Sequence, residues 1–80
     1  MRITVEQKHI DKAERGLCEF CPVALAMAEV LGGIVTVSSG HFSFKGNRYL
    51  LPFLAVEFVE DFDWGQPVEP FSFKIEDIAA

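Results

Sequence analysis

Two cysteines, Cys18 and Cys21, are the residues with the most obvious chemistry in this chain. They stand in a Cys-x-x-Cys spacing directly before Pro22, and a helix that begins there would favour a thiolate at its N-terminus. Such a pair can work as a redox dithiol, or it can supply two of four zinc ligands, with two more from a second copy. His9 and His41 show no ligand spacing that would complete a site within one chain. The favoured interpretation is two small side chains that pack beside a core helix, with no metal and no cofactor.

A second group of candidate residues surrounds an expected hairpin in the middle of the chain. Ser39 and His41 lie at one turn, and Lys45 and Arg48 follow on the next strands. Hydroxyls, turn amides and cationic groups together suit a phosphate or another small anion. Three aromatic residues of the same segment could offer a flat face for a base: Phe42, Phe44 and Tyr49. The simpler alternative is a solvent-facing hairpin with its apolar residues turned inward.

A third group consists of acidic residues on an expected helix over residues 52–64. Glu57, Glu60 and Asp61 follow one another at i, i+3 and i+4, and Trp64 extends the same surface. Such a face could dock a basic surface of a partner protein. The favoured and simpler interpretation is a solvated face that keeps the protein soluble.

The charge is unevenly distributed along the chain. Residues 1–48 hold six basic and five acidic side chains, whereas residues 49–80 hold one lysine and seven acids. Phosphate backbones would repel the acidic half, so we expect no direct binding to nucleic acid. The sequence shows no phosphate-binding loop, and neither histidine lies near an obvious nucleophile. We therefore expect a protein that binds rather than an enzyme.

Length and composition limit the fold to one domain over residues 1–80. Half of the residues are apolar, including eight Phe, which is more than a core of this size easily hides. The simplest way to cover the excess is a homo-oligomer. No apolar run reaches the roughly 18 residues of a membrane span, and two cysteines make no disulfide framework. We expect a cytoplasmic protein with reduced thiols and no membrane contact.

Hydrophobic periodicity and turn residues predict an α+β domain with a small, largely antiparallel sheet. The expected strands cover residues 3–5, 34–38, 41–45, 48–51 and 71–75, and the helices cover Val5–Arg15, 22–31 and 52–64. This gives the order β-α-α-β-β-β-α-β. Thr4 and Gln7 have capping-box spacing at the first helix, and Gly46-Asn47 is the expected turn before the fourth strand. The last strand could pair with the middle strands, with the first strand or across a dimer.

Three motifs stand out beyond these elements. They are His9-Ile10, the run Cys18-x-x-Cys21-Pro22-Val23-Ala24-Leu25-Ala26, and the run Phe62-Asp63-Trp64-Gly65-Gln66-Pro67-Val68-Glu69-Pro70-Phe71. With them, the chain resembles small proteins carried by phages and prophages. The resemblance carries no activity, so no residue inherits a role. It implies action by binding: some phage accessory proteins of this size block a host enzyme or defence complex, and others form oligomers that hold a nucleotide signal.

These observations rank three hypotheses. The first is a homo-oligomeric phage-type accessory protein that sequesters a small anionic, nucleotide-like ligand through Ser39, His41, Lys45 and Arg48. The alternative is an acidic inhibitor that binds a host protein through Glu57, Glu60, Asp61 and Trp64. A thiol or zinc protein that uses Cys18 and Cys21 is a further alternative.

Overall fold

Eight helices and strands follow one another in residues 1–76, the part of the chain that the computed structural model describes. The strands are β1 (Arg2–Val5), β2 (Val35–Ser38), β3 (His41–Phe44), β4 (Asn47–Leu50) and β5 (Phe71–Lys74), and the helices are α1 (Gln7–Lys12), α2 (Pro22–Leu31) and α3 (Phe53–Asp63). Their order confirms the predicted α+β class and the sequence β-α-α-β-β-β-α-β. Among the described residues, no helix is long and apolar enough to span a bilayer.

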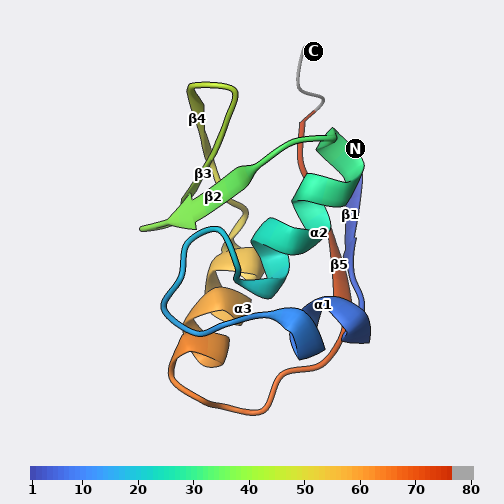
Figure 1. The fold of residues 1–80 in the computed structure, drawn as a ribbon, viewed down its shortest axis with the longest axis vertical. Coiled ribbons are helices and arrows are strands. Elements are labelled where there is room, and N and C mark those ends of the chain that lie inside the picture. Colours follow the sequence, from blue (N-terminus) through green and yellow to red (C-terminus); the bar gives the residue numbers. More distant parts are fainter. Residues whose placement is uncertain (77–80) are drawn as a thin grey trace.

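The strands form two antiparallel sheets instead of a single one. β2, β3 and β4 make a three-stranded meander, and β1 pairs with β5 with Ile3 opposite Phe73. The last strand therefore takes the first strand as its partner, one of three pairings that the sequence leaves open. Figure 1 shows β1 and β5 side by side along α2, with the meander near the opposite flank of this helix. Because α2 packs against both β1 and β2, it joins the two sheets.

Helix α2 has the ends that its sequence predicts. Pro22 occupies the first turn, where no backbone N–H is needed, and Cys21 is the N-cap. Gly32 ends the helix in the left-handed conformation with φ 77°. Between these ends Val23 and Met27 are fully buried. α2 is thus the centre of the core.

Helix α1 is shorter than predicted, and its cap is different. Its N-cap is Glu6, whose capping box is closed by His9, rather than Thr4 with Gln7. Thr4 stays extended in β1, where its hydroxyl lies 3.2 Å from the hydroxyl of Ser72 in β5. Because that strand pairing holds the hydroxyl of Thr4, the helix begins two residues later. It also ends at Lys12 instead of Arg15, and residues 13–21 form an irregular segment, here called the cysteine loop.

Both turns of the meander are two-residue turns with a positive φ at each residue. Ser39 and Gly40 have φ of 51° and 77°, and Lys45 and Gly46 have 50° and 79°. This is the type I′ geometry that suits a tight hairpin. The predicted turn at Gly46-Asn47 is therefore wrong by one residue, and Lys45 belongs to the turn instead of a strand. The type I′ turn places its glycine second, which sets this register.

The spacing of Ala55, Phe58, Val59 and Phe62 predicts one apolar stripe along α3. Ala55, Phe58 and Phe62 are buried, and Val59 is partly buried. Phe58 also stacks on Phe71 of β5, with ring centroids 4.5 Å apart. Large apolar side chains nevertheless stay exposed among the described residues: Met1, Leu17, Phe20, Val30, Ile34, Leu50, Phe53, Leu54 and Trp64. One group of them, Leu50 with Phe53 and Leu54, lies where β4 leads into α3.

Candidate functional site

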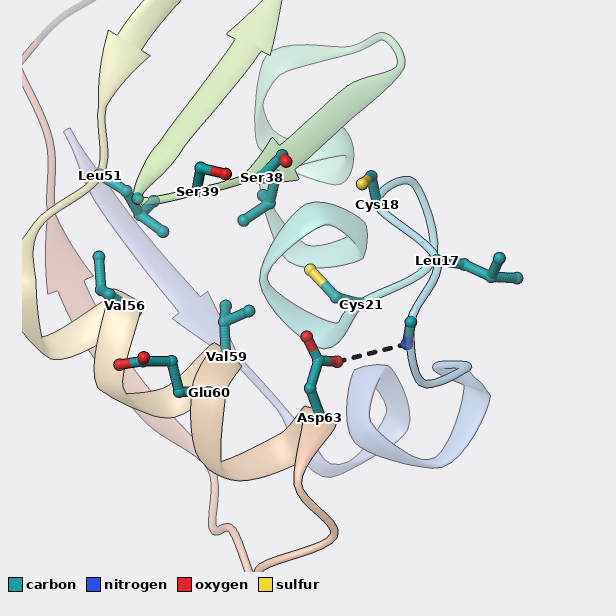
Figure 2. A pocket seen from close by; sticks show the side chains of 13 residues that line it. Leu17, Cys18, Cys21, Ser38, Ser39, Leu51, Val56, Val59, Glu60 and Asp63 are labelled. Carbon is teal, nitrogen blue, oxygen red and sulfur yellow. Dashed lines mark hydrogen bonds between the residues drawn. The ribbon is translucent and has the colours of Figure 1, made fainter.

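A pocket of about 410 Å³ opens between the cysteine loop, the β2–β3 turn and α3 (Figure 2). Its lining residues are Gly16, Leu17, Cys18, Cys21, Val37, Ser38, Ser39, Gly40, Leu51, Val56, Val59, Glu60 and Asp63. The pocket brings together members of all three groups predicted from sequence: Cys18 and Cys21, Ser39, and Glu60. They come from segments that are far apart in the chain, and no local sequence pattern groups them.

Cys21 acts as a helix cap inside this pocket. Its Sγ accepts the N–H of Ala24 at 3.3 Å, and only 3% of the residue is exposed. Burial raises the pKa of the Cys21 thiol to about 11, and the nearby charge of Asp63 acts in the same direction. The helix terminus therefore does not make this cysteine a thiolate at neutral pH, contrary to the expectation from the Cys-x-x-Cys spacing.

Cys18 is held in the fold through its backbone carbonyl and not through its sulfur. Its carbonyl oxygen accepts the N–H of Val37 at 3.0 Å, so the cysteine loop lies against the edge of β2. Its thiol is exposed, and neither cysteine is in a disulfide. The loop is also tied to α3, because Gly16 N–H donates to Asp63 at 3.4 Å and Arg15 Nε donates to Phe62 O at 3.1 Å. Both cysteines thus serve the packing of this loop.

One cluster within residues 1–76 places three ligand-type atoms within 4.8 Å of one another: Glu6, His9 and Glu29. The backbone N–H of Glu6 donates to His9 Nδ1 at 2.9 Å, which requires a lone pair on that nitrogen. The proton of a neutral imidazole is then on Nε2, 2.5 Å from Glu29 Oε2. Because that nitrogen donates to the carboxylate, the tautomer does not suit metal binding there.

The same cluster explains why α1 packs on α2. His9 is buried, and Lys8 Nζ lies 3.2 Å from Glu29 Oε1. The hydrogen bond from His9, followed by that from Lys8, lowers the pKa of Glu29 below its ordinary value. The spacing of these residues in the sequence does not predict this contact. The available signal was Glu29 itself, the one charged residue in an otherwise apolar helix.

The charges around the pocket are negative. Figure 2 shows the carboxylate of Asp63 directed toward Cys21 and that of Glu60 directed away from both thiols. None of the lining residues is Lys, Arg or His, and apolar side chains such as Val56 and Val59 form much of the wall. This environment suits a cationic group with an apolar stem, and it does not suit a phosphate.

The four residues predicted to bind an anion do not meet at one point. Ser39 and Lys45 occupy turns at opposite ends of β3, a four-residue strand that spans about 13 Å. Lys45 Nζ lies 5.4 Å from the ring centroid of Phe44, and His41 Nδ1 lies 3.1 Å from the carbonyl oxygen of Ser39. A single pocket made of all four side chains is absent from residues 1–76.

His41 and Arg48 nevertheless lie on the same side of the meander. Side chains alternate between the two faces of a sheet, and directly paired residues share a face. The pairs Ser43–Arg48 and His41–Leu50 therefore lie on one face, together with two residues of β2. We call this the outer sheet face, and its residues are Thr36, Ser38, His41, Ser43, Arg48 and Leu50. It carries three hydroxyls, the imidazole of His41 and the guanidinium of Arg48, and no carboxylate.

The opposite face of the meander is part of the core. Phe42 and Phe44 are 2% and 5% exposed, and Tyr49 stacks on Phe42 with centroids 5.1 Å apart. Phe42 and Phe44 therefore offer no exposed ring to a base, whereas Tyr49 is only partly buried and lines a second pocket together with Lys74. Phe42 and Phe44 belong to the core cluster, so burial of their apolar area contributes to stability.

The acidic residues of α3 divide between two sides of the helix. Glu57 and Asp61 line a groove with Glu69, whereas Glu60 faces the pocket that also contains Asp63. Trp64 ends the helix and is 82% exposed. The continuous acidic face predicted from the sequence is therefore two acidic sides of one helix.

The geometry leaves two regions with the character of a binding surface: the pocket beside α3 and the outer sheet face. Similarity to known proteins does not choose between them. The chain matches no protein-family model, no curated protein and no solved structure.

Proposed function

We propose that this chain is a phage-type accessory protein that acts by binding, and that it holds a small anionic, nucleotide-like ligand as a homo-oligomer. The observation that carries the proposal is the composition of the outer sheet face. His41 and Arg48 lie there with three hydroxyl side chains, and no carboxylate interrupts them. An oxyanion on this face would receive hydrogen bonds from Arg48 and the hydroxyls. We place the protein in the cytoplasm, where both thiols remain reduced.

The experiment measures binding of adenosine monophosphate and inorganic pyrophosphate by calorimetry. We expect Arg48→Gln to weaken binding by about tenfold or more, because a bidentate charge-assisted contact is lost. Lys12→Gln is the matched control, since it removes one exposed positive charge from the end of α1. Equal weakening by both variants would reduce the effect to general charge, and the proposal would fail.

The pocket supports a second candidate function, the binding of a basic partner protein. Its observation is the pair of carboxylates, Glu60 and Asp63, beside apolar walls that could surround the stem of a lysine or arginine side chain. A lysine-containing peptide amide serves as the probe in NMR titrations. Glu60→Gln should weaken its binding, and Glu57→Gln, on the other side of α3, should not.

A thiol or zinc function has less support from the site. Cys21 is protonated near neutral pH and engaged as a helix cap, and the two sulfur atoms belong to no three-ligand cluster within residues 1–76. Replacing Cys18 with Ser should leave pyrophosphate binding on the outer sheet face unchanged, because Cys18 is not part of that face.

A further inference from the structure

Within residues 1–76, no strand pairs with the outer edge of β4. In an antiparallel ladder, successive residues point their N–H and C=O groups alternately toward and away from the neighbouring strand. The N–H of Leu51 donates to Gly40 O at 2.9 Å, so Tyr49 also faces β3, and Arg48 and Leu50 face away. Within residues 1–76, no hydrogen bond uses the outward backbone groups of Arg48 and Leu50.

This open edge borders exposed apolar surface. Leu50, Phe53 and Leu54 are 76%, 74% and 61% exposed, and all three lie at the β4–α3 junction. The other edge of the meander is different, because Val37 of β2 donates to Cys18 in the cysteine loop. An uncovered edge beside apolar side chains is a template for another strand.

We propose that a second copy of this chain pairs antiparallel with the β4 edge, with Tyr49 opposite the partner's Tyr49. Three two-fold registers would use the outward groups of Arg48 and Leu50. The first places Arg48 opposite the partner's Arg48, and like charges directly opposite are unfavourable. The second places it opposite the partner's Pro52, which has no N–H to donate. The third, which we propose, places Arg48 opposite the partner's Leu50, and the stem of the arginine covers that apolar side chain.

The pairing also completes an anion site. In this register the outer sheet faces of the two copies become continuous, because paired residues share a face. Arg48 and the partner's Arg48 are then diagonal neighbours with Cβ atoms about 7–8 Å apart, within reach of one bridging oxyanion. A single copy offers only one permanent cation on its outer sheet face, so the site is incomplete without the partner. This step rests on the proposed function, and it specifies a multivalent oxyanion such as a pyrophosphate group.

Sedimentation equilibrium of the full chain, with and without inorganic pyrophosphate, tests the proposal. We expect a monomer–dimer equilibrium in which saturating pyrophosphate strengthens the dimer by about tenfold or more. Arg48→Gln should dimerise without responding to pyrophosphate. Leu50→Glu should strengthen the dimer without pyrophosphate, because its carboxylate would lie opposite the partner's Arg48. Leu50 is exposed, so this substitution does not disturb the core.

A cysteine scan fixes the register. In a Cys18→Ser background, Tyr49→Cys should form an intermolecular disulfide, since residues at a non-hydrogen-bonded pair have Cα atoms about 4.5 Å apart. Asn47→Cys lies on the same strand and should cross-link far more slowly. Equal cross-linking of the two variants would overturn the register. A wild-type chain that stays monomeric at every concentration, with and without pyrophosphate, would overturn the dimer.

Different results would overturn the proposed anion-binding function and the proposed pairing of two copies. If Tyr49→Cys cross-links while pyrophosphate neither binds nor strengthens the dimer, the pairing stands and the anion ligand is wrong. If pyrophosphate binds a monomer through Arg48, the proposed function stands and the shared site is wrong.

Discussion

The two edges of the three-stranded sheet resemble each other locally and differ in what covers them. Each follows or precedes a type I′ turn with glycine in second place, and each strand has four residues. At the β2 edge, the cysteine loop supplies the carbonyl of Cys18 to Val37. At the β4 edge, the chain turns directly into α3 and leaves Leu50 exposed. Whether an edge is covered is therefore decided by a segment outside the strand, here the one that follows α1.

The comparison also separates structural from binding chemistry. The cysteines, which look most reactive in the sequence, lie beside the covered β2 edge, where Cys21 caps α2 and the carbonyl oxygen of Cys18 accepts the N–H of Val37. The open side carries His41 and Arg48, whose side chains have no ion pair among the described residues. In a small domain, reactive side chains such as cysteines can thus serve to hold a loop in place. Polar side chains on an exposed sheet face then remain available to a ligand.

The largest effect should come from the helix that supports the covered side. Met27→Ala removes a fully buried side chain from α2, and we expect a loss of about 2–5 kcal/mol in the free energy of unfolding. Leu50→Ala at the open edge should change it by less than about 0.5 kcal/mol at concentrations that keep the protein monomeric. Urea denaturation followed by circular dichroism measures both. Similar losses would mean that the β4 edge is buried in solution.

Substitution of the two cysteines should also change the free energy of unfolding by different amounts, with the larger loss at the buried Cys21. Cys21→Ala removes the acceptor for Ala24 N–H and a buried side chain, so we expect a loss of about 1–2 kcal/mol. Cys18→Ala should cost less than about 0.5 kcal/mol, because its side chain is exposed and its carbonyl remains. Denaturation at pH 7 in a reducing buffer measures the difference. A larger loss at Cys18 would contradict the roles assigned to the two sulfur atoms.

A pH series tests the contact that anchors α1 on α2. The pKa of Glu29 is lowered in the folded protein by the hydrogen bond from His9 and then by Lys8. A lowered pKa gives stability that is present above the ordinary value of 4.5 and is lost as pH falls through the folded-state value. We expect the stability of the wild type to fall more steeply below pH 4.5 than that of Glu29→Gln. Parallel curves would show that the contact does not depend on the carboxylate.

Local signals explain how much of the fold the sequence predicted. Pro22 and Gly32 fixed the ends of α2, and the spacing of Ala55, Phe58 and Phe62 fixed the buried side of α3. The pairing of β1 with β5 was left open, because it joins the two ends of the chain and no local pattern encodes it. The first helix was misplaced for the same reason, since the partner of Thr4 is the distant Ser72.

The site was less predictable than the fold. The pocket combines the cysteine loop with the β2–β3 turn and α3, and the sequence assigned its members to three separate sites. Lys45 was expected beside Arg48 on a strand, but a one-residue shift of the turn placed it elsewhere. Side-chain alternation alone would have put His41 and Arg48 on one face once the pairing of the strands was known. The strand register of the meander was therefore the information that the sequence lacked for predicting the site.

The smallest expected effects come from the two type I′ turns. Asn tolerates a positive φ better than Ser or Lys, so Ser39→Asn should stabilise the covered hairpin by a few tenths of a kcal/mol, up to about 1. Lys45→Asn gains the same stabilisation from the positive φ. It loses the contact between Lys45 Nζ and the Phe44 ring, which is worth about 0.5–1 kcal/mol at an exposed site. Its net effect should therefore be close to zero. Lys45→Gln keeps the unfavourable φ and loses the contact, so it should be the least stable of the three. If Lys45→Asn stabilises the protein as much as Ser39→Asn does, Lys45 is not held against Phe44, and its ammonium is free to serve the open side of the sheet.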